Sequence, residues 1–339
     1  MSGISAATTS LNYGVLTALP VVAALAPEWN ALLARSGCNL AFSSAQWFIA
    51  ACHAQAVQPY LLVARRDTML AGLLPLVVTD DGGSIEFPSY LCDYNDIVSE
   101  PEDVGAAAGL LAHAGSAASA ASSKLVLTNL RADSNCLRAA AELTRTNAIK
   151  FTQRREQSCF YLPLSTSFGE YLQTRSRSFR KGLGRARREA ERNDVCVREL
   201  DAASCPPAQL PEIFLSLNYN RFGHNSHFKS PAAQAFVHEL FPSLFIEHRL
   251  RAFALLAAEK IIGLDICLMG SNSLCTWNGG FNAEAARWSP GKLLLSAGIR
   301  RAYELQLAEY DLLRGTHSYK ASWALATRVL NRIELQLRD

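Results

Sequence analysis

The 339-residue sequence lacks any stretch of about 20 uncharged apolar residues, the length that crosses a bilayer as a helix. Its first 25 residues also lack a basic segment followed by a continuous apolar one, because Asn12, Tyr13 and Gly14 interrupt a run of small residues. We therefore expect no membrane span and no secretory leader. The expected location is the cytoplasm.

Paired cysteine spacing is also missing, although nine cysteines are present. An odd count without a C-x-x-C pair is not typical of a disulfide framework or of a zinc site. Cys267 and Cys275 lie in apolar runs, where cysteine packs as a small hydrophobic residue. No metal site is predicted, and the cysteines are interpreted as core residues rather than nucleophiles.

Net charge is small, because 33 basic residues stand against 30 acidic ones. A net charge of +3 does not indicate a nucleic-acid partner for the whole chain. The content of 49% apolar and 19% charged residues is typical of a globular protein. Since 339 residues exceed the size at which one core stops growing, two domains are expected.

A pattern of strands and helices occurs twice. Residues 59–78 form an apolar hairpin pattern around the turn Asp67-Thr68, and residues 250–269 repeat it, with Gly72 and Gly263 aligned 191 residues apart. Each hairpin precedes a third strand, a helix and a fourth strand; these are 84–88, 103–116 and 124–130 in the first copy, and 273–281, 291–308 and 309–313 in the second. This order predicts an internal duplication of one α/β unit.

The boundary between the two copies is expected between residues 145 and 165. The predicted domains are therefore 1–155 and 156–339. The small polar residues 116–123 are interpreted as a loop inside the first copy. Ser167 and Glu170 have the spacing of a capping box and predict a helix over about 168–193.

That helix is strongly basic. Its cationic residues are Arg175, Arg177, Arg180, Lys181, Arg185, Arg187, Arg188 and Arg192. At helical spacing Phe179, Leu183, Ala186 and Ala190 line one face, and a bend is expected at Gly182 or Gly184. The basic face is either an ordinary solvated surface or a surface for the phosphates of a donor, an RNA or a polyanionic polymer.

The start of the predicted second-copy helix is a candidate anion site. Pro290 is suited to the first helical turn, and free backbone amides there can hold a phosphate. The cofactor-binding candidates are Ser289, Gly291 and Lys292, with Arg177 and Lys181 from the basic helix. The P-loop pattern is absent, and an ordinary helix cap is the alternative.

Polar residues follow the last strand of the second copy, where α/β sheets bind ligands. Asp311 and Arg314 are predicted to bind substrate, and Tyr319 and Lys320 to act in catalysis. Asp265 interrupts an apolar strand and replaces Leu74 of the first copy, so it is a candidate general base.

Two histidines, His224 and His227, are further candidates for moving a proton near neutral pH, and His224 is the preferred one. Arg221, Trp277 and Asn278 complete the predicted substrate-binding set. No Ser-His-Asp or Cys-His order is found, so direct transfer between bound donor and acceptor is favoured over a covalent enzyme intermediate.

Several of these segments together resemble a known family. The segments are YLPL and the basic cluster at 161–192, Trp288-Ser289-Pro290-Gly291-Lys292-Leu293-Leu294-Leu295, and Tyr310-Asp311-Leu312-Leu313-Arg314-Gly315 followed by Tyr319-Lys320 and Trp323. Weaker likenesses are residues 42–47 and 73–76. The chain resembles BioF2-like or CelD-like (cellulose biosynthesis) acetyltransferases of the GNAT superfamily, which are related to FemAB-type transferases with tandem GNAT domains.

The resemblance implies an α/β (α+β) fold of two tandem GNAT-like domains, with mixed sheets flanked by helices and the active site in the second domain. It implies acyl transfer from acyl-CoA, with acetyl-CoA as a co-substrate rather than a tightly bound cofactor, to an amine or hydroxyl of a small-molecule, natural-product or polysaccharide-precursor acceptor. The chain is expected to act as a monomer or homodimer.

The sequence does not determine the identity of the acyl donor. The pyrophosphate loop Q/R-x-x-G-x-G/A is replaced by Trp288-x-x-Gly291-x-Leu293. A transferase that uses aminoacyl-tRNA or a carrier-protein thioester is therefore one alternative. A non-catalytic scaffold of a biosynthetic complex is another, because fold alone does not establish activity.

Overall fold

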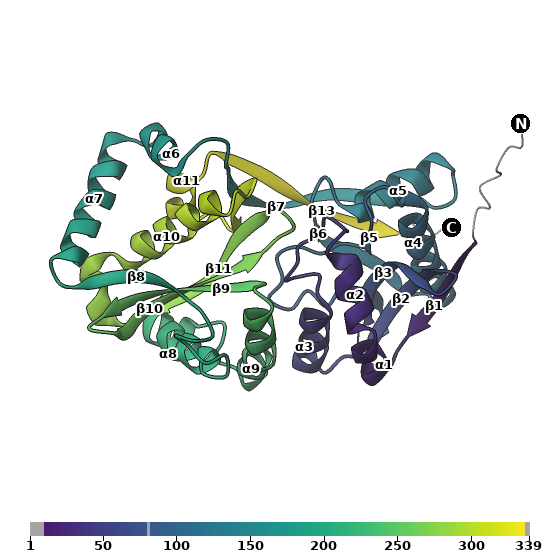
Figure 1. The fold of residues 1–339 in the computed structure, drawn as a ribbon. Coiled ribbons are helices and arrows are strands. Elements are labelled where there is room, and N and C mark those ends of the chain that lie inside the picture. The colour runs from purple at the N-terminus through teal and green to yellow at the C-terminus, as the bar shows by residue number, and fades with distance from the viewer. Residues whose placement is uncertain (1–9, 80–81, 336–339) are drawn as a thin grey trace, which may run out of the picture. The chain divides into compact units, whose positions relative to one another are not determined.

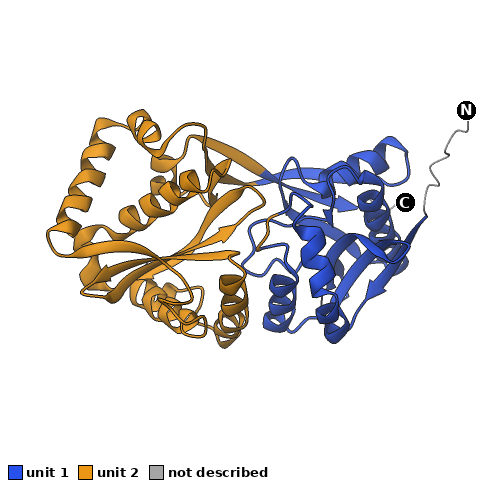
Figure 2. Ribbon diagram, viewed as in Figure 1, with its two compact units in different colours: residues 1–38, 42–156, 330–339 blue, residues 39–41, 157–329 orange. Residues whose placement is uncertain are grey.

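The computed structural model describes residues 10–79 and 82–335 and consists of two compact α/β units (Figure 2). Unit 1 contains the chain up to Cys38, Phe42–Glu156 and the segment from Leu330 onward. Unit 2 contains Asn39–Ala41 and Gln157–Val329. The α/β prediction is confirmed.

The elements of unit 1 are, in chain order, β1 (Leu11–Leu16), α1 (Leu19–Ala24), α2 (Ala26–Leu33), α3 (Ala45–Gln55), β2 (Pro59–Arg66), β3 (Met69–Val78), β4 (Ser84–Glu86), β5 (Val98–Ser99), α4 (Val104–Ala120), β6 (Lys124–Leu130) and α5 (Asn135–Arg145). Strand β7 (Phe151–Pro163) begins in unit 1 and ends in unit 2, and β13 (Ala326–Leu335) runs from unit 2 into unit 1.

The elements of unit 2 after β7 are α6 (Phe168–Thr174), α7 (Arg177–Glu191), β8 (Val195–Leu200), α8 (Leu210–Phe222), η1 (Gly223–Asn225), α9 (Pro231–Ile246), β9 (Leu250–Ala257), β10 (Lys260–Met269), β11 (Ser273–Phe281), η2 (Ala283–Trp288), α10 (Pro290–Glu304), β12 (Glu309–Arg314) and α11 (Ser318–Trp323). They are labelled in Figure 1.

The strand orders of the two units match. Unit 1 has the order β1-β2-β3-β4-β6-β13, and unit 2 has β8-β9-β10-β11-β12-β7. In each, an antiparallel hairpin is followed by a strand that pairs in parallel with the strand after the helix: β4 with β6, and β11 with β12. The predicted duplication therefore describes the topology of both sheets.

The aligned glycines occupy equivalent places. Gly72 pairs with Ala64 and Gly263 with Leu255, and in both hairpins the register shifts next to the glycine. A Cβ on Gly72 would lie 2.8 Å from Leu110 of α4, and one on Gly263 would lie 3.6 Å from Leu294 of α10. The contact at Gly72 leaves no room for a side chain under α4, whereas the distance at Gly263 is an ordinary van der Waals contact with α10.

The sheet of unit 2 is covered on both faces (Figure 1). Leu294, Leu295 and Ile299 of α10 pack with Leu183 of α7 in one core cluster. The other face carries α8 and α9, where Phe214 and Phe241 surround Trp277. Trp277 is thus a half-buried residue that packs among the aromatic side chains of α8 and α9.

Two local predictions differ from the structure. The predicted loop 116–123 is wrong, because α4 continues to Ala120 and buries Ala118 against the core; alanine is the best helix former. The predicted helix over 168–193 is interrupted at Arg175, which is extended, and Ser176 caps α7 by accepting from the Phe179 amide at 3.1 Å.

Other local predictions are confirmed. Ser167 Oγ accepts from the Glu170 amide at 3.2 Å and donates to its carboxylate at 3.0 Å, as a capping residue does. Helix α7 is amphipathic as predicted, with Leu183, Ala186 and Ala190 buried.

The chain passes from unit 1 to unit 2 after Glu156, but the final strand does not stay in unit 2. The predicted second domain extends to residue 339, whereas the structure assigns the segment from Leu330 onward to unit 1. This segment belongs to unit 1 because β13 pairs with β6, where Asn331 and Ile333 lie opposite Leu130 and Leu127.

A bilayer-spanning helix is not found within residues 10–79 and 82–335.

The close approach of α8 to β11 generates a stability prediction. A Cβ on Gly280 would lie 2.3 Å from the backbone carbon and oxygen of Leu217, which cannot move without shifting α8. We expect Gly280→Ala to cost roughly 1–3 kcal/mol of unfolding free energy and to lower the Tm by several degrees.

The matched control is Gly291→Ala, because nothing lies within 4 Å of a Cβ at that position. Thermal unfolding followed by tryptophan fluorescence should leave its Tm unchanged or raised, since alanine favours a helix. Equal Tm values for both variants would contradict the packing described.

Candidate functional site

Strands β11 and β12 separate after a short parallel ladder. Ser273, Leu274 and Cys275 pair with Glu309, Tyr310 and Asp311. Beyond these pairs β11 continues to Phe281 and β12 to Arg314. We call residues 276–281 and 312–314 the strand divergence. Because paired strands satisfy one another's amides and carbonyls, the divergence needs other partners for these groups.

Irregular backbone marks both sides of the divergence. On β11, Trp277 is an extra residue opposite Ile266 and Cys267. On β12 the register with β7 shifts between Asp311 and Arg314, and Leu313 has a φ of 59°, a conformation that is strained for a leucine. Such strain is concentrated at functional sites.

Asp311, predicted to bind substrate, and Lys320, predicted to act in catalysis, both make hydrogen bonds that hold this bulge. Asp311 is fully buried, and its carboxylate accepts from the Leu313 amide at 2.7 Å. Lys320 is 7% exposed, and its Nζ donates to the carbonyls of Leu313 and Arg314, the first at 3.3 Å. The structure therefore gives both side chains a positioning role.

An asparagine pair satisfies backbone groups of β11. Asn218 of α8 donates to Asn278 Oδ1 and to the Gly279 carbonyl, both at 3.0 Å. Asn278 Oδ1 also accepts from the Gly279 amide at 3.0 Å, and Asn218 Oδ1 accepts from Ser226 at 2.6 Å. Asn218 was not singled out in the sequence, because a single asparagine within a helix gives no local signal.

The carboxylate of Asp265 lies at the start of the divergence. Thr276 Oγ1 donates to it at 3.1 Å, and Cys267 Sγ lies 3.6 Å from it. Cys267 Sγ is also 3.5 Å from the Tyr310 hydroxyl. Thr276 is the first β11 residue beyond the parallel ladder, so this chain of polar groups joins β10, β11 and β12.

The environment of Asp265 favours its neutral form. The side chain is partly exposed, but protein atoms surround most of it, and this desolvation raises its pKa to about 7 against the opposing effect of the Thr276 and Cys267 hydrogen bonds. Burial raises the pKa of Tyr310 as well, with a contribution from the charge of Cys267 and then of Asp265. A carboxyl group that titrates near neutral pH can accept and release a proton under physiological conditions.

Tyr319 of α11 is brought into the range of Asp265. It is 51% exposed, yet desolvation of its hydroxyl, and secondly the Asp265 charge, raise its pKa to about 12. The phenol is therefore protonated at neutral pH and can donate a hydrogen bond. Asp265 and Tyr319 are the predicted catalytic residues that the structure places in electrostatic contact.

The predicted cofactor-binding residues lie on two adjacent helices. Ser289 precedes α10 with a φ of 54° and makes no side-chain cap, and Gly291 and Lys292 are exposed in the first turn. Lys292 Nζ lies 3.7 Å from the position of a Cβ on Gly182, so α7 passes next to the start of α10. Arg177 and Lys181 are exposed on α7.

The remaining predicted residues lie elsewhere. His224 and His227 are exposed after α8, which packs on the face of the sheet opposite α10. Arg221 is exposed and stacks 4.5 Å above the Phe281 ring. Arg314 is half-buried at the end of β12. No described contact joins the two histidines to Asp265 or Tyr319.

The raised pKa of Asp265 predicts a pH-dependent cost to folding. The unfolded carboxyl ionises near pH 4, while the folded one stays protonated up to about pH 7. Unfolding therefore releases a proton in this window, and the free energy of unfolding falls as pH rises through it, by up to about 1.4 kcal/mol per pH unit, and levels off above it.

Asp265→Asn removes this term. Its stability relative to the parent protein should increase from pH 4.5 to pH 7 and then stay constant, as measured by denaturant unfolding at several pH values. Asp194→Asn is the control, because Asp194 is exposed and asparagine tolerates its φ of 52°. A difference between parent and Asp265→Asn that does not change with pH would contradict the raised pKa.

Part of the sequence of unit 2 is similar to a known protein family, and the fold of the chain is similar to that of solved structures. Residues 177–321 match the family described as acetyltransferase (GNAT) domain. No curated protein sequence matches the chain.

Three solved structures are similar over nearly the whole chain. The C-terminal domain of a putative lysylphosphatidylglycerol synthetase from Agrobacterium fabrum has a TM-score of 0.64 at 13% identity, covering 93% of this chain and 92% of that one. FemX has a TM-score of 0.62 at 11% identity, with 94% and 96% covered. A tandem GNAT protein from the clavulanic acid biosynthesis pathway has a TM-score of 0.50 at 12% identity, with 97% and 100% covered.

At these identities the similarity concerns the fold. The chain has the α/β fold of tandem GNAT-like domains, and the sequence match to the acetyltransferase (GNAT) domain lies within residues 177–321.

Proposed function

We propose that unit 2 is an acyltransferase that moves an acyl group, with acetyl as the first choice, from a CoA-type thioester to an amine or hydroxyl. The observation that carries the proposal is the Asp265 carboxyl, with a pKa of about 7, at the start of a divergence between two parallel strands. The matched GNAT domain supports it, and we retain the narrower kinship with CelD-like and BioF2-like acetyltransferases as part of the proposal.

The donor would lie along the divergence. Backbone amides and carbonyls of β11 beyond Cys275 are not paired with β12, so an extended amide-containing arm can hydrogen-bond there as a strand does. The phosphates would then lie at the start of α10, near the Gly291 amide and Lys292, with Lys181 on the neighbouring helix.

Proton movement follows from the two perturbed pKa values. The ionised Asp265 accepts a proton as the acceptor nitrogen or oxygen attacks the thioester carbon. The carbon–sulfur bond breaks, and the departing thiolate takes up the proton that Asp265 has received. Tyr319, protonated with a pKa of about 12, donates a hydrogen bond to the developing negative charge.

A second candidate rests on α7. Its residues Arg177, Lys181, Arg185, Arg188 and Arg192 are all exposed. A surface with this many cations can contact the phosphates of an aminoacyl-tRNA donor or the acidic face of a carrier protein. RNA binding that weakens steeply between 50 and 200 mM salt, with no turnover of acyl-CoA, would favour this candidate. Partner binding without turnover of any donor would favour a scaffold.

Activity should depend on Asp265 and on its partner Thr276. With a panel of acyl-CoA donors and amine acceptors, Asp265→Asn should lower kcat by about 10²–10⁴, as loss of a general base does. Thr276→Val removes a hydrogen bond that lowers the Asp265 pKa, so the ascending limb of the pH–rate profile should start near pH 7 in the parent and move to higher pH in the variant.

Asp194→Asn should keep the parent profile. A parent profile that is flat from pH 5 to pH 9, or full activity in Asp265→Asn with any productive donor, would exclude Asp265 as the base. Release of free thiol reports turnover in each case.

Donor affinity should depend on Lys292. We expect Lys292→Ala to weaken acetyl-CoA binding about tenfold in calorimetry, because one charge-assisted hydrogen bond to phosphate is lost. Lys150→Ala, an exposed lysine in unit 1, is the control and should bind as the parent does. Equal affinity in both variants would place the phosphates away from α10.

A further inference from the structure

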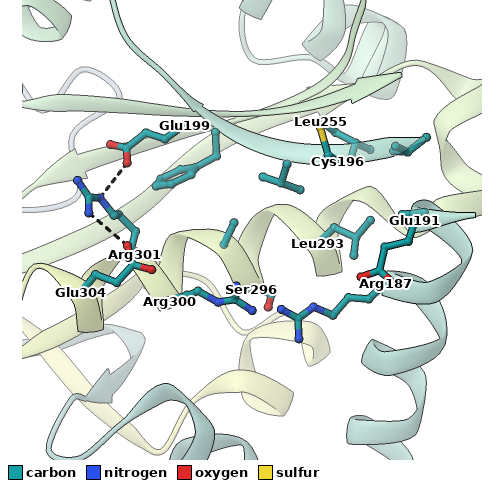
Figure 3. A pocket seen from close by; sticks show the side chains of 15 residues that line it. Arg187, Glu191, Cys196, Glu199, Leu255, Leu293, Ser296, Arg300, Arg301 and Glu304 are labelled. Atoms are coloured by element: carbon teal, nitrogen blue, oxygen red, sulfur yellow. Dashed lines mark hydrogen bonds and ion pairs between the residues drawn. The ribbon is translucent and has the colours of Figure 1, made fainter. Parts of the chain in front are cut away.

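Unit 2 contains a pocket away from the strand divergence. It has a volume of about 340 Å³ and lies between α7, β8, β9 and α10 (Figure 3). The described residues that line it all come from these four elements, and β11 and β12 contribute none of them. A ligand there would therefore occupy different groups from those proposed for the acyl donor.

The floor of the pocket is apolar. Leu255 and Phe253 of β9 and Leu293 of α10 are buried core residues that also line it. Val197 of β8 and Ala297 of α10 are half-buried and present the apolar surface that remains open to solvent. An apolar surface that is open to solvent in a concave site gains free energy when a hydrocarbon or ring covers it.

The rim of the pocket carries two converging guanidinium groups. Arg187 of α7 and Arg300 of α10 point toward one another on either side of the Ser296 hydroxyl (Figure 3). Within the described residues neither has a carboxylate within ion-pair distance. Arg300 is instead held over the Phe168 ring at 5.4 Å, which orients the guanidinium without neutralising it.

The neighbouring charges show that this lack of a counter-ion is local. Arg301 pairs with Glu199 at 2.8 Å and with Glu304 at 3.2 Å, and Glu199 also pairs with Arg251, so these two cations and two carboxylates balance. Glu191 lies beyond Arg187 at the α7 end of the pocket. The positive charge is therefore concentrated between Arg187, Ser296 and Arg300.

We infer that this pocket binds an amphipathic anion. Its carboxylate or phosphate lies between Arg187 and Arg300 with Ser296 as a further hydrogen-bond donor, and its apolar body covers the half-buried Val197 and Ala297. Planar guanidinium groups match both anions in bidentate geometry. The pocket is independent of the proposed acyl transfer, because binding there requires neither Asp265 nor a donor.

The test is calorimetry on the whole chain with four probes. Octyl phosphate and octanoate carry both features, octanol lacks the charge, and inorganic phosphate lacks the apolar body. We expect the two amphipathic anions to bind at least tenfold more tightly than octanol or inorganic phosphate. The tighter of the two identifies the preferred anion.

The variants separate the pocket from general surface charge. Arg187→Gln and Arg300→Gln should each weaken the preferred probe at least tenfold. Arg185→Gln removes an exposed charge from the same helix outside the pocket and should change affinity less than twofold. Glu191→Gln should strengthen binding, because it removes the nearby negative charge, and Ala297→Leu should abolish binding by filling the pocket.

The inference is overturned if octanol binds as tightly as octyl phosphate, if Arg185→Gln weakens binding as much as Arg300→Gln, or if no probe binds at 1 mM. Unfolding curves of each variant confirm that it is folded. An Asp265→Asn variant that binds the probe as the parent does, whatever its activity, keeps this result separate from the fate of the acyl-transfer proposal.

Discussion

The parallel ladder between β11 and β12 ends after three residue pairs, and the rest of the candidate site depends on this ending. Each strand must satisfy the backbone groups that the other no longer pairs. Asn218 and Asn278 do so for β11, while buried Asp311 and Lys320 hold the carbonyls and amides of the β12 bulge. Buried polar groups of this kind are stable only when their hydrogen bonds are complete. The buried polar side chains are present here because the strands separate, and their hydrogen bonds hold the two strands apart.

The duplication shows which parts of a unit serve folding and which serve a site. Both units have a glycine-centred hairpin under a helix and a three-pair parallel ladder. In unit 1, however, β4 ends at Glu86 together with its ladder, and a buried leucine, Leu74, stands where unit 2 has Asp265. A leucine at that place needs no partner. The aspartate costs desolvation energy, which the hydrogen bonds of Thr276 and Cys267 only partly offset.

Much of the fold was predictable because its signals are local. Turn residues between apolar runs identify the hairpins, and the single carboxylate in an apolar strand singles out Asp265. The hydrogen bond of Thr276 to Asp265 was not predictable, since the two residues meet only through strand register. The contacts of Asn218 with Asn278 and Gly279 depend on the close approach of α8 to β11 at Gly280. The errors have the same origin. Residues 116–123 look like a loop by composition, yet burial of Ala118 extends the helix, and the roles of Asp311 and Lys320 depend on a bulge that no spacing reveals.

The edge of the unit 1 sheet beyond β6 is formed by β13, the strand that comes last in sequence among the described residues. Residues 330–335 pair with β6, about 200 residues earlier in the sequence, as Asn331 does with Leu130. During synthesis β6 therefore leaves the ribosome long before its neighbour exists, and unit 1 waits with an unpaired sheet edge while all of unit 2 is made. Unpaired edges are sites of aggregation, and pairing over such a separation is slow. A nascent chain of this topology thus reaches its complete first domain only after its second, and premature termination anywhere in unit 2 leaves both halves of the protein incomplete.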